Sequence, residues 1–203
     1  MLLKLYPDNP NHLEFRQIVD ILRDGGIIIY PTDTVYAIGC DINNTKAIQK
    51  IAKLKGTTAE KGNFSLICNS LSNLAEYAKV DNTTFKMMKK NLPGAFTFIL
   101  QASSNVPKLF KSKKKTVGIR VPNHFIPLRI VEELGNPILT TSIHDPDEVI
   151  EYTTDPELIH EKYHKQVDLI LDSGYGNNTA STIVDCTSDS FEIIRPGIGK
   201  LIL

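Results

Sequence analysis

The chain has 203 residues, is 41% hydrophobic and 23% charged, and has a formal net charge of zero. This composition supports a normal hydrophobic core and excludes a disordered or collagen-like chain. No apolar run reaches the roughly eighteen residues that a membrane helix needs. The N-terminal residues lack the basic and apolar pattern of a signal peptide, so we expect a cytoplasmic protein without a membrane partner.

Apolar periodicity, capping residues and glycine or proline positions predict alternating helices and strands. The expected helices span 11–25, 44–55, 71–78, 82–91, 125–134 and 156–163. The expected strands span 27–30, 64–68, 95–101, 116–121, 137–142, 167–171, 181–185 and 191–195, the last two as an antiparallel pair. In the helix 82–91 we expect Phe85, Met88 and Leu92 to face the core. The elements alternate without strict βαβ regularity, which predicts an α/β (mixed α+β) class and a single domain over residues 1–203, with a twisted mixed sheet flanked by helices.

The cysteines Cys40, Cys68 and Cys186 are far apart and form no C-x-x-C pair. Their spacing argues against a disulfide scaffold and against a cysteine-built zinc site. We therefore expect reduced thiols and no structural metal.

Polar side chains follow the first predicted buried strand directly. The apolar residues Ile28 to Tyr30 end at Pro31, and three hydroxyls and a carboxylate lie within the next five residues, Thr32 to Tyr36. Such groups need hydrogen-bond partners once they leave water. Ligands of open α/β sheets bind beyond the strand ends, so the cluster predicts part of a binding site. A hydrogen-bonded turn is the alternative interpretation.

Similar polar groups follow other strands. They lie in the segments 118–122, 140–142, 181–185 and 195–199. Arg120 interrupts an otherwise apolar strand, and its guanidinium fork suits a carboxylate or phosphate. An internal ion pair with an aspartate is the alternative for this arginine. Together the segments predict a site for an anionic ligand.

The zero net charge hides a basic segment. Residues 79–120 contain ten lysines and arginines against one acid, a net charge of +9 that the rest of the chain balances with −9. This asymmetry predicts a basic face for phosphate or nucleic acid, with solvated lysines as the alternative. The candidate RNA contacts are the lysines Lys108, Lys111, Lys113, Lys114 and Lys115.

One further motif carries a metal hypothesis. His160-Glu161-Lys162-Tyr163-His164 spells H-E-x-x-H, the helix signature of zinc peptidases. Against it, the predicted helix begins near Pro156 and a strand begins near Val167, which puts His164 at the helix end. No third histidine follows to complete the site.

The ordered set of motifs resembles the YrdC/YciO family, whose members include threonylcarbamoyl-AMP synthases of tRNA modification. The resemblance covers about residues 13–200. Its motifs are Tyr30 to Cys40, Lys55, Pro93-Gly94-Ala95-Phe96-Thr97, Gly118 to Pro122, Thr140-Thr141-Ser142, Ser181 to Asp185 and Arg195-Pro196-Gly197.

The resemblance implies a YrdC-like fold with a large concave, positively charged cavity. It implies a reaction in which L-threonine, bicarbonate and ATP give L-threonylcarbamoyladenylate and pyrophosphate, with Mg²⁺ accompanying the nucleotide. Thr34 and Arg120 would then hold threonine, with Arg120 at its carboxylate. The residues facing the nucleotide would be Lys55, Ser142, Ser181 and Arg195. Supporting positions would be Thr32, Tyr36, Thr140 and Lys61.

The sequence departs from the synthase pattern at three positions. Thr57 replaces the arginine of K-x-R, His144 replaces the asparagine of S-x-N, and Ala37 replaces a common glycine. Thr57 cannot supply the positive charge of an arginine, and Lys61 is a candidate to replace it. These changes resemble the YciO branch of the family.

Two hypotheses of function follow. The first is a YciO-like protein that binds ATP or AMP and tRNA or double-stranded RNA, with threonylcarbamoyladenylate synthesis for tRNA modification. The second is a non-catalytic RNA-binding module that uses the basic segment 79–120. The zinc peptidase is a third, resting on His160, Glu161 and His164 alone.

Overall fold

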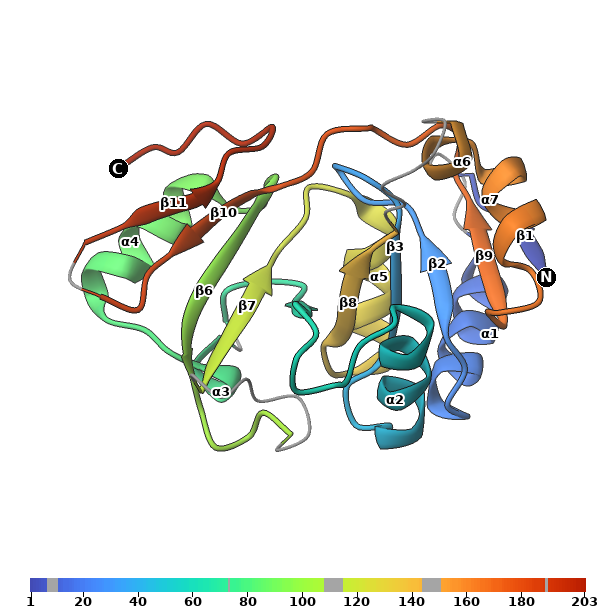
Figure 1. Cartoon of the computed structure of the whole chain (residues 1–203), viewed down its shortest axis with the longest axis horizontal. Helices are drawn as coiled ribbons and strands as arrows, with labels where there is room; N and C mark the ends of the chain where they lie inside the picture. The colour runs from blue at the N-terminus through green and yellow to red at the C-terminus, as the bar shows by residue number, and fades with distance from the viewer. Residues whose placement is uncertain (7–10, 73, 108–114, 144–150, 189) are drawn as a thin grey trace.

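One mixed β-sheet crosses the whole molecule, with helices on both of its faces (Figure 1). The structure is a computed structural model and describes residues 1–6, 11–72, 74–107, 115–143, 151–188 and 190–203. The mixed α/β class expected from the sequence is confirmed; the single-domain assignment over 1–203 stays a prediction.

The sheet contains eleven strands within the described ranges, in the order β1-β9-β2-β3-β8-β4-β7-β6-β10-β11, with β5 pairing to β6. Their bounds are β1 Leu2–Lys4, β2 Ile28–Tyr30, β3 Ala37–Asp41, β4 Ser65–Ile67, β5 Ala78–Lys79, β6 Phe96–Ala102, β7 Thr116–Arg120, β8 Ile138–Ser142, β9 Leu169–Asp172, β10 Thr182–Asp185 and β11 Glu192–Arg195. Parallel pairs join β1 to β9, β9 to β2, β4 to β7 and β6 to β10. The remaining pairs are antiparallel, including the β10–β11 hairpin that the sequence predicted.

Helices bury their apolar stripes against the two faces of the sheet. Their bounds are α1 His12–Arg23, α2 Thr45–Leu54, α3 Leu74–Tyr77, α4 Asn82–Asn91, α5 Phe125–Leu134, α6 Glu151–Thr154 and α7 Pro156–Tyr163. Helices α1 and α5 share one core cluster with β2 and β9, whereas α2, α4 and α7 belong to a second cluster. The sheet is therefore covered on both sides, as near-continuous apolar strands require.

The helix starts follow from capping. The side chain of Asn11 accepts a hydrogen bond from Leu13 N at 3.0 Å, and that of Asn44 accepts one from Ala47 N at 3.0 Å. Each side chain satisfies a backbone donor that the first turn of a helix leaves unpaired. Gly135 ends α5 with a φ of 83°, a left-handed conformation that glycine adopts without strain.

Two sequence expectations about helices were wrong. Phe85 points outward from α4 and is 40% exposed, because the buried face of this helix is formed by Thr84, Met87, Met88 and Asn91. The helix expected over 71–78 is only the short α3, since Ala78 already pairs with Ala102 in the sheet.

The strand β3 was not predicted from the sequence; it forms a hairpin with β2. Ala37 and Gly39 have low strand propensity, but their small size lets neighbouring chains approach. A Cβ on Gly39 would lie 2.6 Å from Ile138 Cγ2 and 2.9 Å from Tyr30 Cε1. Close packing in the sheet centre therefore overrides local propensity here.

The last residues of the chain return to α4. Asn91 Nδ2 donates to Ile202 O at 2.8 Å, and Ile202 N donates to Asn91 Oδ1 at 2.9 Å. Lys90 Nζ also donates to Leu203 O at 2.7 Å. Residues 196–203 are thus fastened to a helix far away in sequence, as the red C-terminal trace beside α4 shows (Figure 1).

Candidate functional site

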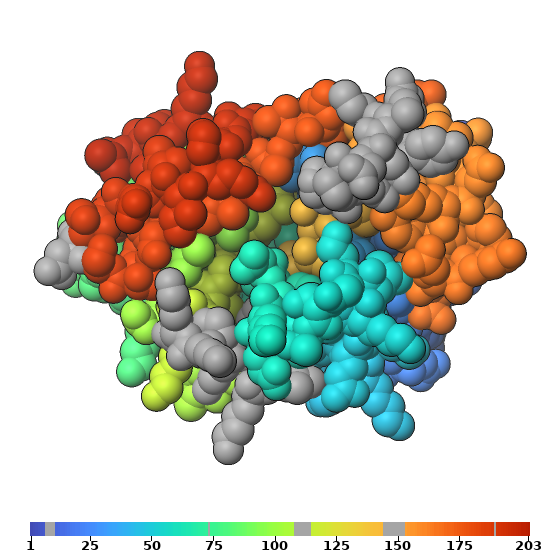
Figure 2. Space-filling view, viewed as in Figure 1, coloured from blue at the N-terminus to red at the C-terminus, as the bar shows by residue number. Residues whose placement is uncertain are grey.

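The polar strand ends meet at one cavity of about 530 Å³ over the middle of the sheet. Figure 2 shows this hollow between the C-terminal residues in red and the teal segment that follows α2. Seven residues expected at the site line the cavity: Thr34, Lys55, Arg120, Thr140, Ser142, Ser181 and Arg195. They come from six separate parts of the chain, which the strand order brings together.

Arg120 is the most buried charge of the cavity wall, at 6% exposure. Its Nη2 donates to Asp33 Oδ1 at 3.1 Å and to Thr34 Oγ1 at 3.0 Å. The internal ion pair that the sequence left open as an alternative is therefore present. Burial lowers the pKa of Arg120, and the carboxylate of Asp33 opposes that shift.

Part of the Arg120 guanidinium nevertheless has no protein partner. Its Nε is buried and makes no hydrogen bond within the described residues. A buried donor without a partner is costly, so this nitrogen is an unsatisfied group of the site. Arg120 thus lines the cavity with Nη2 held by the protein and Nε unsatisfied.

The loop after β2 holds Thr34 through hydroxyl contacts. Thr34 N donates to Thr32 Oγ1 at 3.1 Å, the two threonine hydroxyls lie 3.0 Å apart, and Thr32 Oγ1 donates to Val35 O at 2.7 Å. Tyr36 is fully buried, and its hydroxyl donates to Gly174 O at 2.7 Å. Thr32 and Tyr36 therefore lie outside the cavity and shape the loop that carries Thr34.

The residues expected to face a nucleotide lie on two sides of the cavity. Lys55 Nζ donates to Ser142 O at 3.3 Å, which brings the end of α2 to the end of β8. Arg195 Nη2 donates to Ser181 O at 2.8 Å, so the two C-terminal strands present their polar groups side by side.

The floor between the walls is formed by residues that the sequence analysis did not single out. Thr97 Oγ1 lies 2.9 Å from Ser181 Oγ, and a Cβ on Gly118 would lie 2.6 Å from Ser65 Oγ. Gly118 and Thr97 belong to motifs of the resemblance, which could have suggested them. Ser65 carried no such signal.

The cavity is positively charged in its described part. Lys55, Arg120 and Arg195 line it, and no aspartate or glutamate is among the described lining residues. Hydroxyls and guanidinium groups in this arrangement suit a ligand with carboxylate and phosphate groups.

Other expected residues lie elsewhere. Lys61 is exposed and does not line the cavity, and Thr57 is half-buried just beyond α2. Lys115 is exposed at the start of β7. The lysines Lys108, Lys111, Lys113 and Lys114, and also His144, lie outside the described residues.

The H-E-x-x-H residues do not form a metal centre. His160 and Glu161 lie on α7, and the Nδ1 of the C-cap His164 lies 3.1 Å from His160 O and 2.9 Å from Glu161 O. Within the described ranges no group of three or more histidine, cysteine, aspartate or glutamate side chains could hold a metal. None of the three residues lines the cavity.

His124 lies beside the site and caps α5. Its Nδ1 accepts a hydrogen bond from Ile126 N at 3.3 Å. Burial lowers the pKa of His124, with a smaller opposing effect of Asp33. The neutral imidazole is therefore both the favoured form and the form that can cap the helix.

Fold and cavity together define a class: a mixed α/β protein with a cationic cavity. The Sua5/YciO/YrdC family model, described as "Telomere recombination", matches residues 20–197, and the chain belongs to this family. No described helix is long and apolar enough to cross a membrane.

Relatives of two kinds are similar to the chain. The "Uncharacterized protein YciO" of Escherichia coli is 42% identical over 199 residues, covering 97% of this chain and 95% of the relative. Its crystal structure matches with a TM-score of 0.91 and covers 98% of this chain and 97% of that one. A threonylcarbamoyl-AMP synthase of Pseudoalteromonas translucida is 30% identical, covering 82% of this chain and 90% of the relative.

A solved structure with a bound ligand also matches. P. abyssi Sua5 complexed with L-threonine is 25% identical with a TM-score of 0.85, and the match covers 97% of this chain but 57% of that protein.

The buried ion pair yields a stability prediction. Asp33→Asn removes the charge that compensates Arg120, and we expect the free energy of unfolding to fall by about 3 kcal/mol. Glu132→Gln is the matched control, because Glu132 pairs with Arg129 at 3.1 Å on the surface, where a loss below about 1 kcal/mol is expected. Urea denaturation measures both, and equal losses would contradict a special role for the buried pair.

His124 yields a pH prediction. Its folded pKa lies below the unfolded value of about 6.5, so the unfolded chain takes up the proton first and stability falls as the pH drops through that value. His124→Asn keeps a capping acceptor but does not titrate. When the pH is lowered from 7.5 to 5, we therefore expect the wild type to lose more stability than the variant, as measured by thermal unfolding. Parallel curves for the two proteins would disprove this assignment.

Proposed function

We propose that the cavity binds L-threonine and ATP and forms L-threonylcarbamoyladenylate, as the resemblance to threonylcarbamoyl-AMP synthases suggests. The observation that carries the proposal is the meeting of Thr34 and Arg120 with Lys55, Ser142, Ser181 and Arg195 in one cavity. Its volume of about 530 Å³ lies within the range of small-molecule sites.

The threonine subsite would use Arg120 and Thr34. The Arg120 guanidinium would face the substrate carboxylate, while the hydrogen bond between Arg120 Nη2 and Thr34 Oγ1 fixes both side chains beforehand. Such fixed groups bind without a large ordering cost. The L-threonine named for the P. abyssi Sua5 structure supports this choice of ligand.

The nucleotide subsite would use the four residues that the resemblance assigns to the nucleotide. Lys55 and Arg195 would face the phosphates as cations, and Ser142 and Ser181 would donate hydroxyl hydrogen bonds. Mg²⁺ would arrive with the nucleotide: the described lining residues offer hydroxyl oxygens but no carboxylate, and Mg²⁺ is commonly held by substrate phosphates and water.

The chemistry would require positioning more than a strong base. The threonine amine and bicarbonate form a carbamate with loss of water. A carbamate oxygen then attacks the α-phosphorus, the bond to the β-phosphate bridge breaks, and pyrophosphate leaves. Orientation of the reactants and neutralisation of phosphate charge would supply most of the rate enhancement.

Two variants test the subsites separately. Arg120→Lys keeps the charge but loses the fork, and we expect threonine affinity to fall at least about tenfold with ATP affinity little changed. Arg195→Ala, at an exposed guanidinium, should weaken ATP and spare threonine. Calorimetry with each ligand measures both, with Arg129→Ala on α5 as a surface control. Equal effects of the two cavity variants on both ligands would contradict the assignment.

Turnover is tested by pyrophosphate release. We expect release from ATP that requires both threonine and bicarbonate, and a higher rate for Thr57→Arg, which restores the arginine of the synthase motif. Binding of both ligands without pyrophosphate release would leave the binding roles but refute the synthase activity.

RNA binding is a second candidate, favoured by the charge of +9 over residues 79–120. Lys86, Lys89 and Lys90 project from the exposed face of α4, while Met87 and Met88 face the core. Lys79 and Lys115 are exposed as well.

Phosphate contacts predict that binding of tRNA or double-stranded RNA weakens steeply with salt. Replacing Lys86, Lys89 and Lys90 by glutamine should reduce both the affinity and the salt slope. A matched triple change of Lys46, Lys53 and Lys165 outside the segment should have little effect. Gel-shift titrations at several salt concentrations measure this, and unchanged binding in the first variant would refute the candidate.

A further inference from the structure

A second pocket lies on the other side of the loop that carries Thr34. Its volume is about 570 Å³, and its floor begins where β2 and β9 end, at Pro31 and Ser173. These two strands are parallel neighbours, and the space beyond the carboxyl ends of parallel strands is the usual place for a ligand in an open α/β sheet. Thr32 lines this pocket, whereas Thr34 lines the cationic cavity.

The chemistry of the second pocket differs from that of the cavity. None of its described lining residues is a lysine, arginine, aspartate or glutamate. Its polar groups are hydroxyls, two asparagine amides and the imidazole of His124. A phosphate or carboxylate therefore finds no counter-charge there, and the pocket suits an uncharged ligand with several hydrogen-bonding groups.

Two of these side chains are fixed by one atom and present another. Asn177 Oδ1 accepts a hydrogen bond from Thr179 N at 3.0 Å, which assigns the amide orientation and makes the Nδ2 group the one available for a ligand. His124 Nδ1 accepts from Ile126 N, so the proton of the neutral ring lies on Nε2. Neither the Asn177 Nδ2 group nor the His124 Nε2 has a hydrogen-bond partner within the described residues.

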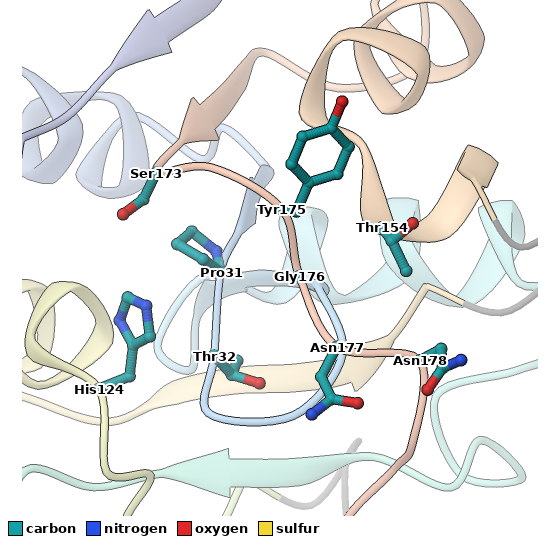
Figure 3. A pocket seen from close by; sticks show the side chains of 9 residues that line it. All are labelled: Pro31, Thr32, His124, Thr154, Ser173, Tyr175, Gly176, Asn177 and Asn178. Atoms are coloured by element: carbon teal, nitrogen blue, oxygen red, sulfur yellow. The ribbon is translucent and has the colours of Figure 1, made fainter.

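The arrangement places one hydrogen-bond donor on each side of the floor. Figure 3 shows His124 and Asn177 flanking Thr32, with the ring of Pro31 nearby. Thr32 between them offers no competing group, because its Oγ1 already bonds to Thr34 and to Val35. The backbone of Asn177 is held as well, since its N donates to Thr34 O at 3.0 Å.

We propose that this second pocket binds a planar, uncharged nucleobase that carries two carbonyl oxygens, of the uracil type. Asn177 Nδ2 and His124 Nε2 donate to the two carbonyls, the Ser173 hydroxyl accepts or donates at the ring edge, and the ring of Pro31 provides a flat apolar surface. The base comes either from a free nucleoside or from an unpaired residue of RNA. The proposal does not depend on the reaction in the cationic cavity.

The probes are uridine and cytidine, which share the ribose and the C2 carbonyl. They differ at C4, a carbonyl in uridine and an amino group in cytidine, and at N3, which carries a proton only in uridine. Titration of the labelled protein with each, followed by the side-chain amide signal of Asn177 in ¹H–¹⁵N spectra, measures binding. We expect saturable shifts with uridine and at least about tenfold weaker binding of cytidine, whose amino group meets a donor instead of an acceptor. Equal binding of the two nucleosides would mean ribose recognition and would overturn the proposal, as would the absence of any shift with uridine.

Variants and related ligands sharpen the test. Asn177→Asp keeps the acceptor for Thr179 N but replaces the donor group by an oxygen, and it should weaken uridine about tenfold. Asn105→Asp makes the same change on an exposed loop and should have no effect. If circular dichroism shows that the Asn177→Asp variant does not fold, the Asn177→Ala variant replaces it with the same expected result.

Uridine monophosphate should bind no more tightly than uridine, because no lysine or arginine is among the described lining residues of the pocket. A large gain from the phosphate would refute the assignment. Tighter binding of a short single-stranded oligouridylate than of uridine would identify RNA as the source of the base. Equal affinity would identify the free nucleoside.

Discussion

The buried guanidinium of Arg120 is the constraint on which the site depends. An arginine at 6% exposure must be compensated, and Asp33 provides the charge from a loop almost ninety positions earlier in the chain. That contact, together with the Arg120–Thr34 and Asn123–Asp33 hydrogen bonds, holds the loop after β2 against the end of β7. It also occupies Nη2 and leaves the buried Nε without a partner, so a structural ion pair forms part of the wall of the candidate site.

The sheet topology explains why residues from so many segments meet. The β2–β3 hairpin and β8 bring Thr34, Thr140 and Ser142 to one wall, while β6, β10 and β11 bring Thr97, Ser181 and Arg195 to the other. The parallel β4–β7 pair lies between them, with Gly118 leaving space at the floor. The cavity is thus a property of strand order, and neither wall exists within one continuous stretch of sequence.

Much of this fold was predictable from local signals. Asn11, Asn44 and Gly135 mark helix ends by chemistry that needs no tertiary context, and the apolar strands that follow are unambiguous. Phe85 and β3 show the limit, because helix orientation in a weakly amphipathic segment and strand formation by Ala37 and Gly39 are decided by neighbours from distant sequence. The site residues could be predicted as polar strand ends, but the partner of Arg120 could not, since sequence alone does not say which aspartate lies opposite. The second pocket gave no advance signal, because Asn177 and His124 belong to loops whose meeting depends on the complete fold.

The attachment of residues 196–203 to α4 has a consequence for the path of the C-terminal tail. Strand β11 is exposed along its whole length, so burial contributes little to holding Arg195 at the rim. The two hydrogen bonds between the Asn91 side chain and the Ile202 backbone hold the chain beyond that strand. Residues 197–199 are also hydrogen-bonded to Ala180 and Thr182, so the tail is anchored both beside Arg195 and at α4. A fusion partner joined after Leu203 would therefore leave the molecule beside α4.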